Sequence, residues 1–135
     1  MPDENPYPML VDEQYMSLTT YRKSGKAVPT PVWFAQDGAR LYVYTADNSG
    51  KVKRLRHTSE VEIAPCDAQG NITGERMTAY AYLHEDGTAL GKTANAALNQ
   101  KYGLLKRAIS LLQALRGRSP IFIEVLPDAK ATDSA

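Results

Sequence analysis

The feature that most constrains the fold is a β-hairpin centred on Asp37-Gly38. The residues before this pair, Val28 to Ala35, and those after it, Leu41 to Thr45, are rich in β-branched and aromatic side chains. An Asp-Gly pair between two such runs is a strong signal for a hairpin turn, because glycine accepts the positive φ that the turn requires. The hairpin predicts antiparallel sheet in this part of the chain.

Four further segments have the composition of β-strands. They are Tyr15 to Tyr21, Val61 to Pro65, Arg76 to His84 and Pro120 to Leu126. With the two arms of the hairpin they predict six strands with hairpin-like connections, which favour an α+β fold or a small barrel over a doubly wound fold. The last strand is strongly apolar, so we expect it to be central rather than at an exposed edge.

Two segments are interpreted as helices. Lys51 to Arg56 is too short and too basic for a core strand and predicts a short helix. Thr93 to Arg116 lacks proline and carries apolar residues at helical spacing. Gly103 is expected to break or kink this segment, because glycine is a poor helix former.

The length of 135 residues predicts one domain spanning 1–135. Both ends, 1–12 and 127–135, are expected to be flexible. No stretch approaches the roughly 20 apolar residues that cross a bilayer, and the acidic start of the chain is unlike a signal peptide. We therefore expect a cytoplasmic protein with no membrane partner.

Charge and residue counts exclude several classes of function. A net charge of +1 argues against nucleic acid as a partner. The single cysteine, Cys66, excludes an internal disulfide. With only His57 and His84 as histidines, the chain has few ligands for a metal centre, and no metal site is predicted.

The densest chemical feature is the segment Ser49 to Arg56, in which four cations fall within six residues. If a helix begins near Gly50, its free N–H groups favour an anion. Lys51 and Arg54 are three residues apart and can reach one phosphate together. Lys53 points away from them and can contact a second acidic group. The alternative is a solvated basic helix face, which is the commoner fate of such a run.

The second feature is the run Pro29-Thr30-Pro31-Val32-Trp33. Proline has no N–H, so this strand must lie at a sheet edge or be open where its prolines occur. The unpaired backbone groups need water or a flat hydrogen-bonding ligand, and Trp33 would offer an aromatic wall. The alternative is an edge strand that its prolines protect against aggregation.

Pro65 and Cys66 could place a thiol next to a pocket. No His, Asn or Asp stands in a known catalytic relation to Cys66, so a buried structural cysteine is the favoured interpretation.

In this order, Thr19 to Thr45, Ser49 to Arg56 and Val61 to Gly74 resemble the split β-barrel flavin-binding family related to pyridoxamine 5′-phosphate oxidase. The most similar branch is that of small deazaflavin-dependent oxidoreductases, which Lys101 to Val125 also resembles. The resemblance runs from about Tyr15 to Val125. It implies a mainly β fold, a six-stranded antiparallel split barrel of FMN-binding type with short helices, and a homodimer with cofactor sites at the subunit interface.

The resemblance also implies a cofactor, either coenzyme F-420 (8-hydroxy-5-deazaflavin) or FMN. Cations of the short helix would hold its phosphate and two hydroxyls would approach its ribityl-phosphate. The proline strand would lie against the ring, and the end of the following strand would lie near it. The resemblance assigns the phosphate to Lys51, Lys53 and Arg54, and the ribityl-phosphate to Thr45 and Ser49. It assigns the ring contacts of the proline strand to Thr30, Pro31, Val32 and Trp33, and those at the end of the following strand to Pro65 and Cys66.

The implied activity is that of an oxidoreductase, with hydride passing to or from a small conjugated organic substrate. No catalytic residue is assigned, because no acid or base stands out and the cofactor would perform the chemistry. Pyridoxamine phosphate is not the expected substrate, since the chain is shorter than the vitamin B6 oxidases and lacks their basic, histidine-containing C-terminal segment. The alternatives are a non-catalytic flavin, deazaflavin or tetrapyrrole carrier, and a nucleic-acid-binding barrel.

Overall fold

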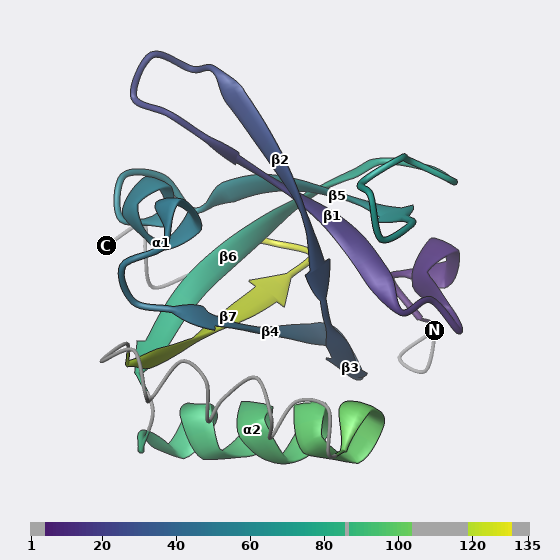
Figure 1. Cartoon of the computed structure of the whole chain (residues 1–135), viewed down its shortest axis with the longest axis vertical. Coiled ribbons are helices and arrows are strands. Elements are labelled where there is room, and N and C mark those ends of the chain that lie inside the picture. The colour runs from purple at the N-terminus through teal and green to yellow at the C-terminus, as the bar shows by residue number, and fades with distance from the viewer. Residues whose placement is uncertain (1–4, 86, 104–118, 131–135) are drawn as a thin grey trace.

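The computed structural model describes residues 5–85, 87–103 and 119–130. Within them, seven strands form one antiparallel sheet, in the order β2-β1-β5-β6-β7-β4-β3 (Figure 1). The mainly β class is therefore confirmed. The elements are η1 (Pro8–Leu10), β1 (Tyr15–Tyr21), β2 (Ala27–Trp33), β3 (Ala35–Asp37), β4 (Arg40–Ala46), α1 (Gly50–Leu55), β5 (Glu60–Cys66), β6 (Met77–Glu85), α2 (Ala89–Tyr102) and β7 (Pro120–Leu126).

The prediction of six strands is wrong, because the segment Val28 to Ala35 is divided at Phe34 into β2 and β3. β2 pairs with β1, whereas β3 pairs with β4 through the hairpin at Asp37-Gly38. The Phe34 ring is buried in the core, and its N–H donates to the Tyr102 hydroxyl at 2.9 Å. β2 and β3 are the two ends of the strand order and are joined through Phe34, so the sheet curls back toward its start (Figure 1).

The two faces of the sheet pack against different partners. On β7, Ile123 and Val125 lie in the main core, whereas Phe122 belongs to a second cluster with α2. This alternation follows from the two-residue period of a strand. β7 pairs with β4 on one side and with β6 on the other, so the prediction that the last strand is central is confirmed.

The helix α2 lies across β3, β4 and β7 (Figure 1). It starts earlier than predicted, after Thr88, whose hydroxyl accepts the Gly91 N–H at 3.1 Å. It ends at Gly103, which has a φ of 58° and terminates the helix in a conformation that favours glycine. The predicted break at Gly103 is confirmed, and the rest of that helical prediction, 104–116, lies outside the described residues.

The short elements η1 and α1 contribute to the main core. Leu55 of α1 is buried there, as are Tyr7 and Leu10 at the N-terminal side. Tyr7 and Leu10 lie within 1–12, the range that the sequence analysis expects to be flexible. The Tyr7 hydroxyl donates to the Ala39 carbonyl at 2.9 Å. In the described part of the chain, no helix is both long and apolar enough to cross a membrane.

Candidate functional site

The cations predicted to bind phosphate lie on α1 and against β1. The Arg54 guanidinium folds over the start of the helix, where a Cβ at Gly50 would lie 2.7 Å from its Nη1. Glycine leaves room for this side chain. The Arg54 Nε also donates to the Thr20 hydroxyl of β1. Arg54 is therefore fixed between α1 and β1, with Lys51 one turn away on the same helix.

This cluster has no counterion among the described residues. No ion pair there joins Lys51, Lys53 or Arg54 to a carboxylate. Burial and the charge of Arg54 lower the pKa of Lys51. Burial and the charge of Arg22 lower the pKa of Arg54. Like charges are thus held close together without an acid, an arrangement that a bound anion would stabilise.

Thr45 and Ser49, whose hydroxyl groups are predicted to approach the ribityl-phosphate, lie next to these cations. Ser49 is the N-cap of α1, and its oxygen accepts the Val52 N–H at 3.3 Å and the Thr45 hydroxyl at 3.2 Å. Because the Ser49 oxygen accepts both bonds, its own hydrogen is free to donate elsewhere. α1 has just six residues, so the argument for an anion rests on these side chains rather than on the helix terminus.

The four ring-binding candidates of β2 face two directions. Val32 pairs with Met16, a core residue of β1, so Val32 and Thr30 face inward. Pro31 and Trp33 alternate with them and face outward. The four side chains therefore do not converge on one surface, and what they share is the backbone of β2.

The free edge of β2 presents carbonyl groups. Among the described strands β2 pairs only with β1, so the predicted edge position is confirmed. Pairing uses alternate residues, and proline cannot donate, so the backbones of Pro29 and Pro31 point away from β1. Their carbonyls lie along the free edge, where neither proline contributes an N–H donor of its own. This edge suits a ligand that donates hydrogen bonds.

The cation cluster and Trp33 lie toward opposite ends of β2. Thr20, which binds Arg54, pairs with Val28 near the start of the strand, and Trp33 is its last residue. Five residues at roughly 3.3 Å each separate Val28 from Trp33 by about 16 Å. The spacing suits an elongated ligand with an anionic group at one end and a flat ring at the other.

Pro65 and Cys66 lie at the end of β5, with β1 between them and β2. Cys66 pairs with Tyr15, which pairs with Trp33, so the cysteine and the indole share the outer face. Pro65 alternates with Cys66 and faces inward. Neighbouring strands are about 4.8 Å apart, which puts the Cys66 and Trp33 backbones about 10 Å from each other. Burial and nearby carboxylates raise the pKa of the Cys66 thiol, so it is not activated as a nucleophile.

Two residues at this site were missed by the sequence analysis. Arg22 follows β1, and its charge acts on Arg54. Tyr102 of α2 stacks on Trp33, with ring centroids 4.9 Å apart and an interplanar angle of 11°. The basic run after β1 could have pointed to Arg22. No local signal indicates Tyr102, because its position depends on how α2 packs against the sheet.

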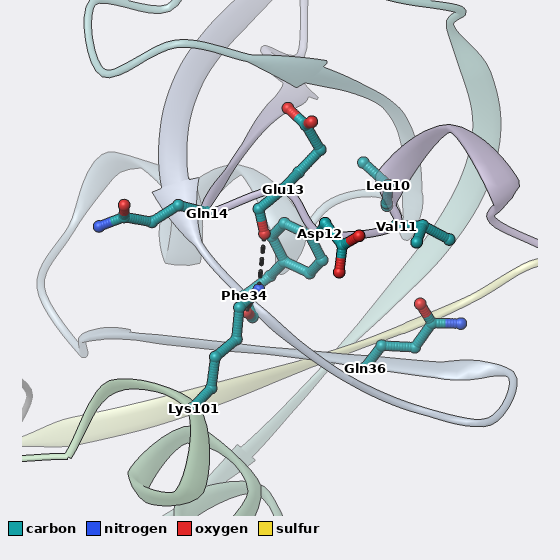
Figure 2. A pocket seen from close by; sticks show the side chains of 8 residues that line it. All are labelled: Leu10, Val11, Asp12, Glu13, Gln14, Phe34, Gln36 and Lys101. Carbon is teal, nitrogen blue, oxygen red and sulfur yellow. Dashed lines mark hydrogen bonds between the residues drawn. The ribbon is translucent and has the colours of Figure 1, made fainter.

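Two cavities, of about 430 and 480 Å³, lie near Phe34 at the last turn of α2 and share Gln36 and Lys101. Figure 2 shows the first, with Lys101 reaching from α2 to the backbone at Glu13. Burial lowers the pKa of Lys101 to about 8, and the charge of Glu13 opposes this shift. Neither of these two cavities is lined by a predicted cofactor-binding residue.

A separate charged cluster surrounds Glu124, whose side chain is 2% exposed. Lys130 Nζ lies 2.9 Å, His84 Nε2 3.0 Å and Arg40 Nε 3.3 Å from its carboxylate oxygens. Burial alone would raise the pKa of Glu124, but hydrogen bonds from Lys130 and His84 outweigh it and lower that pKa. The described residues contain no group of three or more His, Cys, Asp or Glu that could hold a metal ion.

The described residues thus combine a curled antiparallel sheet, a free proline-containing edge and a cation cluster that has no counterion among them. Residues 8–119 match the model of the pyridoxamine 5′-phosphate oxidase family. The chain belongs to this family, whose fold is a split barrel, and the predicted family is thereby confirmed. No curated protein sequence matches the chain.

Solved structures share this fold at low sequence identity. The chain is similar to HutZ, the heme storage protein from Vibrio cholerae, with a TM-score of 0.68 and 16% identity over 88% of this chain and 84% of that one. It is similar to an F-420 reductase, with a TM-score of 0.58 and 19% identity over 93% of this chain and 95% of that one. It is also similar to a FAD-binding protein from Mesorhizobium loti, with a TM-score of 0.60 and 13% identity over 90% of this chain and 84% of that one. At these identities the likeness shows the fold alone.

Proposed function

We propose that the protein is an oxidoreductase that binds coenzyme F-420 or FMN and transfers hydride to or from a small conjugated organic substrate. The observation that carries the proposal is the cluster of Lys51, Arg54 and Arg22, which has no counterion among the described residues. Family membership and the fold likeness to an F-420 reductase and a FAD-binding protein support a cofactor of this type.

The cofactor phosphate would bind to the side chains of Lys51 and Arg54. Charge-assisted hydrogen bonds to phosphate are among the strongest that side chains make. The Ser49 hydroxyl, which Thr45 holds in place, would donate to the same group. Lys53 is exposed on α1 and would meet a second acidic group, such as a longer anionic tail.

The ring would lie along the open edge of β2, from Thr30 to Trp33. Outward carbonyls at the prolines would accept hydrogen bonds from ring N–H groups, and Trp33 would cover part of the ring. Cys66 shares the outer face with Trp33, whereas Pro65 faces inward. When bound, the cofactor supplies the hydride chemistry, while the chain binds it, orients it and excludes water.

We propose that a second copy of the chain completes this site, as a homodimer. The family resemblance implies cofactor sites at a subunit interface, and neither of the two cavities near α2 is lined by the proposed cofactor-binding residues. Apolar side chains of the second copy would cover the ring. Sedimentation should give the mass of a dimer, and a monomer that still binds cofactor tightly would contradict this part of the proposal.

A non-catalytic tetrapyrrole carrier is the second candidate, favoured by the fold likeness to the heme storage protein HutZ. Heme propionates are anionic and would suit the same cations. Heme iron also needs an axial ligand. His84 already contacts Glu124 at 3.0 Å, which leaves His57, an exposed residue after α1. Titration with hemin should therefore give weak binding without a histidine-ligated spectrum, and a tight histidine-ligated complex would favour the carrier.

The experiment that tests the proposal is identification by mass of the cofactor that copurifies with the protein. We expect FMN or coenzyme F-420. Reduced cofactor on the protein should then be oxidised in a single turnover by quinone-like acceptors, whereas pyridoxamine 5′-phosphate should not be a substrate. If the protein binds either cofactor but transfers hydride to no acceptor, the carrier function is favoured. If it binds neither cofactor, the proposal is contradicted.

A further inference from the structure

The last turn of α2 is attached to the point where the chain leaves β2 for β3. The Tyr102 hydroxyl lies 2.9 Å from the Phe34 nitrogen, 2.7 Å from the Phe34 oxygen and 2.8 Å from the Gln14 oxygen. It accepts the Phe34 N–H and can donate to one of the two carbonyls at a time. This hydroxyl occupies the place where the β1–β2 ladder would otherwise continue beyond Trp33.

Lys101 strengthens the same attachment. Its ammonium donates to the Phe34 carbonyl at 2.7 Å and to the Glu13 carbonyl at 2.8 Å, and it lies 3.7 Å from the centroid of the Phe34 ring (Figure 2). The ammonium thus makes two hydrogen bonds to carbonyl oxygens and a cation–π contact with the ring face. Lys101 therefore ties the last turn of α2 to the residues that precede β1 and follow β2.

The stacking of Trp33 on Tyr102 connects this attachment to the proposed ring site. The two rings are nearly parallel, so Tyr102 covers one face of the indole and fixes its plane. Trp33 is half-buried and ends the strand whose edge would hold the cofactor ring. The backbone bonds and the ring contact come from one side chain, so the indole and the strand edge are held together.

We propose that Tyr102, supported by Lys101, is a positioning residue that holds Trp33 and the end of β2 in the geometry of the proposed ring site. The inference rests on the proposed function for the role of that site, but the positioning of Trp33 is independent of any cofactor. Tyr102 is not a catalytic residue, since it acts through Trp33 and the β2 backbone.

Trp33 is the single tryptophan of the chain, so its fluorescence reports this position alone. In cofactor-free protein, acrylamide quenching should be about twofold stronger in Tyr102→Leu than in wild type, because both the ring contact and the hydroxyl are lost. Tyr102→Phe keeps the ring and should lie between the two. Tyr80→Phe, the same chemical change on β6, should match wild type. Unchanged quenching in a folded Tyr102→Leu would overturn the positioning of Trp33. If that variant does not fold, unchanged quenching in Tyr102→Phe would do so.

Binding of FMN and of coenzyme F-420 is measured on the same variants, together with Trp33→Leu. We expect Tyr102→Leu and Trp33→Leu to weaken binding by a similar factor, about tenfold, which corresponds to losing one aromatic contact. Weaker binding in Trp33→Leu but not in Tyr102→Leu would overturn the role of Tyr102 in the ring site. If wild type binds neither cofactor, the proposed function fails, and the quenching data alone then decide whether Tyr102 positions Trp33.

Discussion

Two cationic clusters among the described residues differ in whether the chain supplies the opposite charge. Around Glu124, three basic side chains converge on one buried carboxylate. Around α1, Lys51 and Arg54 are close to Arg22, and no carboxylate pairs with them among the described residues. The first arrangement contains a carboxylate of the chain itself, which holds Lys130 against β7. The second is incomplete and has the charge of a site for an anion. Clusters of similar composition can therefore serve structure in one place and binding in another.

The largest expected effect is on binding at α1. The double change Lys51→Glu with Arg54→Glu should weaken FMN or F-420 binding by about 100-fold or more, because two charge-assisted phosphate contacts become repulsive. The control is Arg76→Glu with Lys92→Glu, which reverses two exposed charges away from the site. Affinity that survives the first double change would remove the phosphate assignment.

The next effect is on stability at Glu124. Glu124→Gln should lower the free energy of unfolding by about 2 kcal/mol, because charged hydrogen bonds to a buried acceptor are lost. Its control is Glu62→Gln, which breaks the exposed pair with Arg76 at 3.1 Å and should cost less than about 1 kcal/mol. Lys51→Met should leave this free energy unchanged or raise it. If Lys51→Met is as destabilising as Glu124→Gln in urea unfolding, the contrast between the clusters is wrong.

The two helix caps offer a smaller effect that separates stability from binding. Ser49→Ala and Thr88→Ala should each lower the free energy of unfolding by about 1 kcal/mol, as each removes an N-cap hydroxyl. Only Ser49→Ala should also weaken cofactor binding, because only Ser49 lies beside the cations of α1. Equal binding by both variants would restrict Ser49 to a capping role.

The smallest effect expected is on pH dependence. Since the folded pKa of Glu124 is below its ordinary value of 4.5, its stabilising contribution is complete above about pH 4.5 and is lost as pH falls through the folded pKa. The stability difference between wild type and Glu124→Gln should therefore shrink in acid. The pKa of Lys51 is also lowered, but for a base this means that stability rises as alkaline pH removes its charge. Urea unfolding at several pH values measures both, and a difference at Glu124 that does not change with pH would contradict its assignment.

Much of the fold follows from local signals, and the exceptions have physical causes. The Asp37-Gly38 hairpin, the edge position of β2 and the helix end at Gly103 depend on the backbone preferences of glycine and proline, which sequence reveals directly. The division at Phe34 depends instead on a hydroxyl from α2, 68 residues away along the chain. No pattern within Val28 to Ala35 carries that information.

The candidate site divides in the same way. Lys51, Lys53 and Arg54 could be selected from their density in the sequence. Arg22 joins them only because β1 passes beside α1, and Tyr102 joins Trp33 only through helix packing. The opposite directions of Thr30 and Trp33 follow from strand alternation, yet the resemblance had grouped both as contacts of one ring. Tertiary contacts thus decide which partners a locally recognisable residue receives.

The central claim is that the uncompensated cations of α1 bind the phosphate of a flavin-type cofactor. The most direct measurement compares the affinity of the protein for each cofactor with its affinity for the phosphate-free form of that cofactor. FMN is compared with riboflavin, and coenzyme F-420 with the deazaflavin that carries only the ribityl chain. Wild type should bind the phosphorylated form of its cofactor about 100-fold more tightly, and Lys51→Ala with Arg54→Ala should reduce that ratio to nearly one. Equal affinities of wild type for both forms would contradict the claim.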